Sequence, residues 1–247
     1  MQNSNTVSIY LPKGIALTKG IMEQPTDQVT TYQSMIGSLM YLVTGIRPDL
    51  AYTISFLAQF SSCTTHEHIK AAKHVFRYVN RTRNLGLFYP HTTTNTMDLY
   101  VDADFAGCQD TRRSTSGYIV LFNNCCVSWL SKKEASVAKS TTKAEFVAMS
   151  YGTRHIRWLL KGLADLRLLV PIAIHADNTC ANFLAVNPRI NVRTKHIAVD
   201  FIITSEALKD KLFVLLKVES VNNLADICTK IVAKPAHQRI VTLLGCR

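Results

Sequence analysis

The sequence predicts an α/β protein with a mixed sheet covered by helices, preceded by a small helical segment. Two observations carry this prediction. Before about residue 95 the apolar residues recur at helical spacing, and after it short apolar runs of strand composition alternate with amphipathic helical stretches. The 247 residues, of which 47% are hydrophobic and 18% charged, are enough to bury a substantial core.

Residues 30–82 predict three helices from their apolar spacing. Pro48 suits the first turn of the second helix, because proline lacks the N–H that a first turn leaves unpaired. Thr64 and Thr65 are suitable caps for the third helix. The polar stretch 91–96 is typical of a linker, so we place a helical domain at residues 1–95 and a second domain at residues 96–247.

The sequence of the second domain begins with three predicted strands, and the last two of them form a hairpin. Asn123 and Asn124 separate these two strands, and asparagine tolerates the positive φ that a tight hairpin turn requires. Ser140 to Thr142 cap a long helix that runs to about Leu163. The predicted order is βββαβααβα, with strands at 97–101, 118–122, 125–130, 171–176 and 212–218, and further helices at 178–186, 194–209 and from 223 onward.

Composition restricts the partners and the compartment. Lys and Arg number 28 against 17 Asp and Glu, and the net charge of +11 favours a polyanion such as nucleic acid over a merely basic soluble protein. No apolar run is long enough for a membrane span, and the N-terminal residues lack a signal-peptide pattern. The seven cysteines include no C-x-x-C pair. We expect reduced thiols, a cytoplasmic or nuclear location and no membrane partner.

Four carboxylates lie where predicted strands end and predicted helices begin: Asp102, Glu145, Asp177 and Asp226. Carboxylates gathered at such positions repel one another, and a divalent cation is the usual compensation. Four carboxylates suit two magnesium ions.

The segments that carry these residues resemble the ribonuclease H domain of copia-type retrotransposon Pol polyproteins. The resemblance lies in residues 100–107, 110–118, 128–133, 143–148, 176–181, 193–197 and 223–230. The helical half resembles the segment that connects polymerase to nuclease in the same polyproteins, in residues 32–42, 47–51 and 71–78. The chain has no Y-x-D-D motif, so we expect no polymerase activity and regard it as a fragment of such an element.

The resemblance implies a ribonuclease H-like mixed sheet with helices on both faces. It implies that Asp102, Glu145, Asp177 and Asp226 are the catalytic residues and the ligands of two Mg²⁺ ions, with Mn²⁺ as an alternative. The implied activity is metal-dependent hydrolysis of the RNA strand of RNA·DNA hybrids, with the hybrid and a polymerase domain of the same element as partners. A catalytically silent nucleic-acid-binding remnant is the alternative. The order of acidic residues in an integrase or transposase does not fit, because that order ends in glutamate and the glutamate here, Glu145, is the second of the four carboxylates.

Basic and hydroxyl residues around the carboxylates are candidate nucleic-acid contacts. The loop with Arg112, Arg113, Ser114 and Thr115 could hold backbone phosphates, or it is a solvated turn. The other candidates are Lys132, Lys133, Lys195 and His196. We expect Asp104 to support the metal site rather than to bind metal, and Trp129 and Trp158 to lie in the core rather than to stack on bases.

Overall fold

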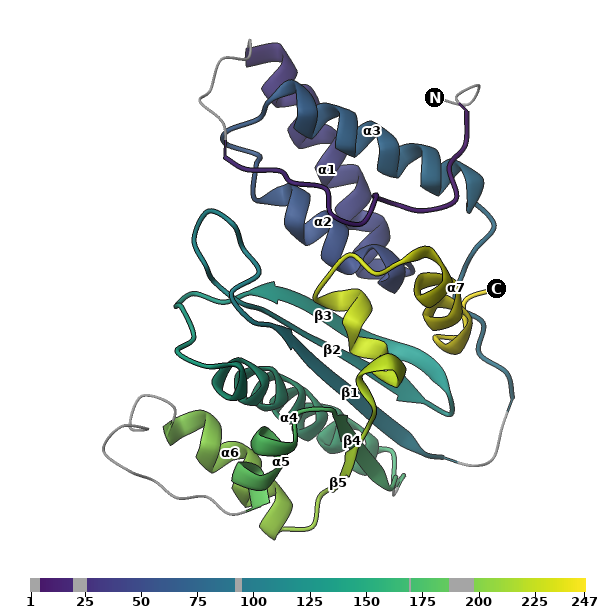
Figure 1. Cartoon of the computed structure of the whole chain (residues 1–247). Helices are drawn as coiled ribbons and strands as arrows, with labels where there is room; N and C mark the ends of the chain where they lie inside the picture. Colours follow the sequence, from purple (N-terminus) through teal and green to yellow (C-terminus); the bar gives the residue numbers. More distant parts are fainter. Residues whose placement is uncertain (1–4, 20–25, 92–94, 169, 187–197) are drawn as a thin grey trace. The chain divides into compact units, whose positions relative to one another are not determined.

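The computed structural model describes residues 5–19, 26–91, 95–168, 170–186 and 198–247 (Figure 1). The chain forms two compact units. One comprises Met1–Phe88 together with Lys230–Arg247, and the other comprises Tyr89–Thr229. None of the described helices is long and apolar enough to cross a bilayer.

The helical unit contains the three predicted helices and one more from the C-terminal part of the chain. Pro48 begins the short 3₁₀ helix that leads into α2, as expected. Thr65 is the N-cap residue of α3, and its backbone N–H donates to Nδ1 of His68 at 2.9 Å. The elements are α1 (Thr26–Gly45), η1 (Pro48–Leu50), α2 (Ala51–Ala58), α3 (His66–Arg81) and α7 (Lys234–Leu243).

A buried polar network holds α7 in the helical unit. Arg47 and Asp49 form an ion pair at 2.8 Å with both side chains almost fully buried. The Tyr78 hydroxyl donates to Oδ2 of Asp49 at 2.8 Å and lies 3.4 Å from Nε2 of His237 on α7. His237 brings α7 against this buried network, so residues 230–247 pack with the first helices. The domain limits predicted from the sequence, 1–95 and 96–247, therefore differ from the limits of the compact units.

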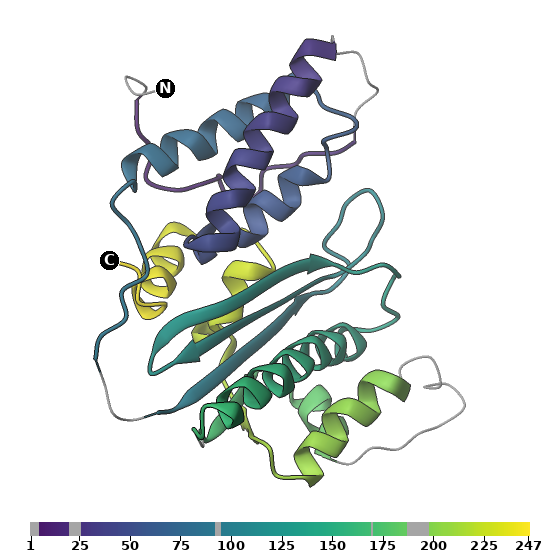
Figure 2. The same ribbon diagram turned by 180° about the vertical axis from the view of Figure 1, so that it is seen from behind.

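The other unit is built on a five-stranded mixed sheet in the order β3-β2-β1-β4-β5 (Figures 1 and 2). β1 pairs antiparallel with β2 and parallel with β4, and β4 pairs parallel with β5. This order and these directions are those of the ribonuclease H-like sheet that the sequence predicted. The strands are β1 (Met97–Asp104), β2 (Thr115–Phe122), β3 (Cys125–Lys133), β4 (Ile172–Ala176) and β5 (Val214–Lys217).

Three helices cover one face of the sheet: α4 (Thr141–Asp165), α5 (Thr179–Val186) and α6 (Ala198–Lys209) (Figure 2). α4 approaches β1 closely at Gly152, where an added Cβ would lie 2.8 Å from the Leu99 side chain. The short 3₁₀ helices η3 (Ser220–Asn222) and η4 (Leu224–Cys228) follow β5. η4 approaches the sheet at Gly117, where an added Cβ would lie 2.7 to 2.8 Å from Thr229 and Cys228. Both contacts require glycine because a methyl group would occupy the space of a neighbour.

The structure corrects several predicted boundaries. Asn123 and Asn124 form the predicted hairpin turn with φ of 51° and 62°. However, β1 continues to Asp104 and β2 begins at Thr115, because the antiparallel ladder extends through Asp102↔Gly117 to its last rung. Asp102 therefore lies inside a strand, not at its end. The predicted last helix is two elements, η4 and α7, and Asp226 belongs to the first of them.

Candidate active site

Three of the predicted carboxylates meet beside the central strand. Asp102 is on β1, Glu145 is in the second turn of α4, and Asp177 directly follows β4. One carboxylate oxygen of each lies within 4.8 Å of the others. Since β1 and β4 are parallel neighbours, their carboxyl-terminal ends lie at the same end of the sheet. Ser140 accepts a hydrogen bond from the Lys143 N–H at 3.2 Å and fixes the start of α4, which brings Glu145 to the same place.

The donor set of these carboxylates, which we call the acidic triad, fits hard divalent cations. All three ligands are carboxylate oxygens, and Asp102 is only 3% exposed. Three like charges this close destabilise one another unless a cation neutralises them. Opposite oxygen ligands of one Mg²⁺ are about 4.2 Å apart, and paired catalytic ions are about 3.5 to 4 Å apart. The carboxylate oxygens of the triad lie within 4.8 Å of one another, so they could bind one ion if they moved slightly closer together, or two ions. The acidic triad could therefore hold metal ions.

Hydroxyl groups from the segment after β5 orient two of the three carboxylates. Ser220 Oγ donates to Oδ2 of Asp177 at 2.6 Å. Thr229 Oγ1 donates to Oδ2 of the buried Asp102. Each hydroxyl restricts the rotation of the carboxylate to which it donates.

The fourth predicted ligand, Asp226, is not in the acidic triad, but its element is fixed beside it. Asn223 donates from Nδ2 to the backbone oxygen of Val101 at 2.8 Å, one residue before Asp102. The Asn223 side chain also accepts from the N–H of Ala225 and begins η4. Asp226 thus lies on a short helix that is tied to β1 at both ends, through Asn223 and through Thr229.

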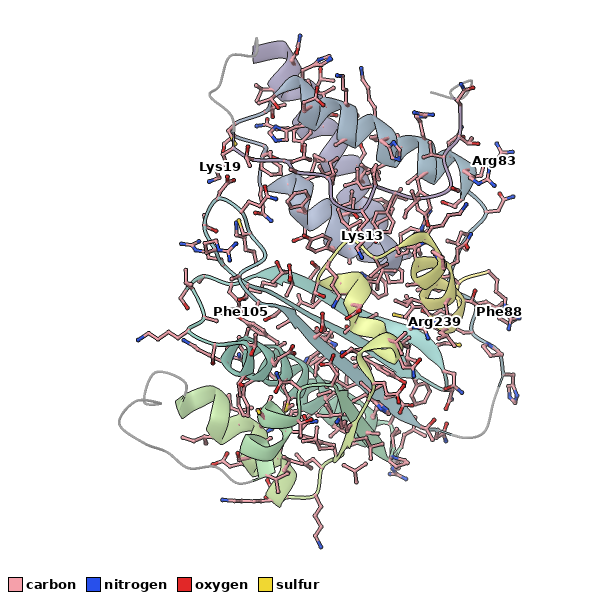
Figure 3. All side chains as sticks on the ribbon, viewed as in Figure 1. Lys13, Lys19, Arg83, Phe88, Phe105 and Arg239 are labelled. Carbon is pink, nitrogen blue, oxygen red and sulfur yellow. The ribbon has the colours of Figure 1, made fainter. Side chains whose placement is uncertain are left out.

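Asp104 also stays outside the acidic triad. An added Cβ at Gly107 would lie 1.7 Å from Oδ2 of Asp104, so the carboxylate folds over the glycine of the loop that follows β1. The expectation that Asp104 supports the metal site without binding metal stays a prediction. The same loop begins with Phe105, which is 38% exposed (Figure 3).

The predicted nucleic-acid contacts differ in accessibility. Arg112 and Arg113 are exposed on the loop between β1 and β2, which closes through the hydrogen bond from Arg112 N–H to the Cys108 carbonyl at 2.8 Å. Ser114 and Thr115 are buried, and Ser114 Oγ accepts from the Ala106 N–H. These two side chains are therefore not exposed: Thr115 is the first residue of β2, which begins earlier than the sequence predicted, and Ser114 directly precedes it.

Lysines at the end of β3 continue the basic surface of the unit. Lys132 is exposed, with Nζ 4.4 Å from the centre of the Tyr151 ring. Lys133 Nζ donates to Sγ of Cys108 at 2.7 Å. Lys195 and His196, also predicted as nucleic-acid contacts, lie outside the described residues.

The contact with Lys133 makes Cys108 a distinctive thiol. Its partial burial alone would raise the pKa of the thiol. Hydrogen bonds from Lys133, from the Thr111 hydroxyl and from the backbone N–H groups of Thr111 and Asp110 outweigh this effect and lower the pKa to about 7. All seven cysteines of the chain are free thiols.

The chain is similar to curated proteins over most of its length. It is 35% identical to the retrovirus-related Pol polyprotein from transposon RE1 of Arabidopsis thaliana. The aligned region has 218 residues and covers 87% of the chain. It is 31% identical over 251 residues to the Pol polyprotein from transposon TNT 1-94 of Nicotiana tabacum, which covers 99% of the chain. The chain is homologous to the C-terminal region of copia-type Pol polyproteins. No family model matches the sequence.

The chain spans only 15% of the RE1 polyprotein and 19% of the TNT 1-94 polyprotein. It is also 44% identical over 128 residues to secreted RxLR effector protein 161 of Plasmopara viticola, covering 52% of this chain and 90% of that protein. Among solved structures, LC11 RNase H1 matches 56% of this chain and 96% of its own, with a TM-score of 0.44 and 13% identity.

Sequence reasoning missed the residues that orient the carboxylates of the acidic triad. Thr229 and Asn223 belong to a segment that the resemblance included, but only the structure shows their hydrogen bonds to Asp102 and Val101. Ser220 carried no sequence signal, because a single serine in a polar loop is common. Gly117 lies within the segment 110–118, and the close approach of Thr229 and Cys228 explains why a side chain is absent there.

Proposed function

We propose that this chain is a ribonuclease H-type endonuclease that hydrolyses the RNA strand of RNA·DNA hybrids. The observation that carries the proposal is the acidic triad, three carboxylates within 4.8 Å on an RNase H-like sheet. The homology to copia-type Pol polyproteins supports it, because those polyproteins belong to retrotransposons.

The residues of the chain have separable roles in this reaction. Two divalent ions supply an activated water and stabilise the leaving oxygen in this class of hydrolysis. Asp102, Glu145 and Asp177 would hold the ions, and Asp226 on η4 would complete the set. Thr229 and Ser220 keep the carboxylates of Asp102 and Asp177 oriented before substrate arrives. The arrangement requires no protein nucleophile.

Substrate binding would use the exposed basic residues of the same unit. Arg112, Arg113 and Lys132 are exposed and could contact backbone phosphates of the hybrid. The 2′-hydroxyl groups distinguish the RNA strand from the DNA strand. A silent binding remnant would gain nothing from three close carboxylates, since their repulsion opposes both folding and the approach of a polyanion.

The experiment incubates the purified chain with an end-labelled RNA·DNA hybrid in Mg²⁺, beside RNA·RNA and DNA·DNA duplexes. We expect cleavage of the RNA strand of the hybrid alone, leaving 3′-hydroxyl and 5′-phosphate ends, and loss of cleavage in EDTA. Binding of the hybrid without cleavage in Mg²⁺ or Mn²⁺ would identify the silent remnant instead. Cleavage that persists in EDTA would exclude the acidic triad as its source.

A further inference from the structure

A second basic surface lies on the outer side of α4. A cavity of about 330 Å³ opens beside α6, lined by Arg154, Arg157, Trp158, Lys161 and Ile203. The first four residues follow one side of α4, and Ile203 comes from α6, which packs along α4 (Figure 2). We call these five residues the α4 patch.

Trp158 is the unusual member of the α4 patch. The sequence predicted a core position, but the side chain is 66% exposed. Its inner side is supported by a row of rings: the Trp158 and His155 centroids are 5.5 Å apart, and His155 stacks on Tyr118 of β2 at 5.2 Å. The indole is therefore anchored to the sheet on one side and open to water on the other. An anchored, exposed aromatic ring beside cations is typical of a binding surface.

Positive charge surrounds the open indole. Arg157 and Lys161 are exposed and form no ion pair within the described part of the chain. Arg154 lies over the Tyr151 ring, with Cζ 5.0 Å from its centre, and Lys132 lies over the same ring at 4.4 Å. The basic surface thus continues from α4 to the end of β3.

The α4 patch is separate from the acidic triad. At 100° per residue, Arg157, Trp158 and Lys161 lie roughly 120 to 220° around the helix axis from Glu145. They also lie about 18 to 24 Å further along the axis. A ligand on the α4 patch would therefore leave the acidic triad free.

We propose that the α4 patch binds a single-stranded nucleic acid, with one base stacked on Trp158 and adjacent phosphates on Arg157 and Lys161. Base faces are buried inside a duplex, so an exposed ring of this kind selects an unpaired strand. The combination of a stacking ring and unpaired cations fits this ligand better than an acidic peptide, which has no flat ring to offer the indole. The net charge of +11 favours the same polyanion.

The test measures binding of fluorescein-labelled oligo(dT) and oligo(U), each about 15 nucleotides long, by anisotropy without divalent metal. We expect Trp158→Ala to weaken binding about 5- to 100-fold through loss of one stacked base. Arg157→Gln with Lys161→Gln should flatten the dependence of log affinity on log salt by about 1.4, at about 0.7 for each lost phosphate contact. Lys73→Gln with Lys209→Gln changes the net charge equally at exposed positions elsewhere and should leave the slope unchanged.

Intrinsic fluorescence locates the contact. Oligonucleotide should quench the wild-type emission, and the variant Trp158→Phe, which keeps only Trp129, should not be quenched. Hybrid cleavage by Trp158→Ala should equal that of the wild type, so this proposal and the proposed nuclease function can fail independently. Equal oligonucleotide affinity in wild type and Trp158→Ala would overturn the proposal. Binding to phosphatidylserine vesicles that requires Trp158 and is not displaced by oligonucleotide would overturn it in favour of a lipid surface.

Discussion

Asp177 tests the acidic triad at the scale of one residue. Asp177→Asn removes one negative charge with little change in volume, and the amide oxygen can still accept from Ser220. We expect hybrid cleavage to fall by about 100-fold or more, because a metal ligand is lost. The thermal midpoint should stay equal or rise slightly, since like-charge repulsion within the triad is relieved.

Two matched carboxylates serve as controls for that change. Asp104→Asn, outside the acidic triad, should reduce cleavage less, and Asp210→Asn, exposed after α6, should leave it unchanged. The initial rate of hybrid cleavage and a thermal melt of each variant provide the comparison. A loss of only a few-fold in Asp177→Asn would contradict its role as a metal ligand.

Cys108 offers a second prediction at the residue scale. Because its pKa is lowered to about 7, a large fraction is thiolate at neutral pH, and the thiolate is the species that iodoacetamide alkylates. Lys133→Met removes the ammonium donor, so the midpoint of the pH profile for alkylation at Cys108 should move up. Mass spectrometry of the peptide that contains Cys108 gives this profile directly. An identical midpoint in Lys133→Met would show that Lys133 does not stabilise the thiolate.

Gly117 determines how closely η4 approaches the sheet, and it belongs to the scale of the element. Gly117→Ala places a methyl group where Thr229 and Cys228 now lie, so the segment that orients Asp102 must move away. We expect a loss of about 1 to 3 kcal/mol in the free energy of unfolding, as for other overpacked sites, together with reduced hybrid cleavage.

Gly162 provides the matched control, because an added Cβ there meets nothing within 4 Å. Gly162→Ala, in the last turns of α4, should raise stability by about 0.5 to 1 kcal/mol through its better helix propensity. Urea denaturation followed by circular dichroism measures both variants. Equal stability of Gly117→Ala and wild type would mean that η4 has room to move without cost.

Elements governed by local chemistry were predictable from the sequence. The turn at Asn123 and Asn124, the cap at Ser140 and the start of η1 at Pro48 depend on residues a few positions apart. The ends of β1 and β2 were not predictable in this way, because their last rungs depend on pairing between distant residues. The exposure of Trp158 was missed for the same reason: the spacing of apolar residues shows which side of α4 is apolar, but not how far α6 covers it.

In the candidate site, too, positions set by local sequence were predictable and positions set by long-range contacts were not. Three of the four predicted carboxylates form the acidic triad, because each follows or begins an element whose type the sequence predicted. The position of Asp226 was less well predicted, since η4 is fixed by the bond from Asn223 to Val101 and not by its own propensity. The burial of Thr115 likewise follows from the longer β2.

At the scale of the whole molecule, each unit contains a histidine that links stability to pH: His155 is half-buried and His237 is buried. Burial lowers the pKa of His155 in the sheet unit. Burial also lowers the pKa of His237 in the helical unit, where Asp49 acts in the opposite direction and Arg47 in the same direction. In the unfolded chain both imidazoles have a pKa of about 6.5. As the pH falls below that value the unfolded state takes up protons first, so the free energy of unfolding decreases until the folded pKa values are reached.

The measurement is the urea midpoint from about pH 8 down to about pH 5.5, above the range in which most carboxylates titrate. His237→Gln should reduce the loss of stability of the helical unit below about pH 6.5, because its unfolded state no longer gains that proton. The matched control is His66→Gln, at an exposed position of α3, which should retain the wild-type dependence. A pH dependence in His237→Gln equal to that of the wild type would exclude His237 as its source.

Net charge leads to the last prediction. A chain with a charge of +11 that binds a hybrid through phosphates releases condensed counterions, so its affinity should fall steeply with salt, by about 0.9 in log affinity per log salt for each contact. Arg112→Gln with Arg113→Gln should flatten that slope by roughly one to two if both exposed side chains touch phosphates. Glutamine keeps a polar side chain at Arg112, whose φ is 51°, so the loop conformation is changed little. Cleavage of bound hybrid should change less than binding, because in the proposed function these arginines position the duplex and the acidic triad holds the metal ions. An unchanged slope would show that the loop with Arg112 and Arg113 faces solvent and does not contact the hybrid. Lys132, the exposed cation beside Tyr151, would then be the candidate for the contact with the phosphate backbone of the hybrid.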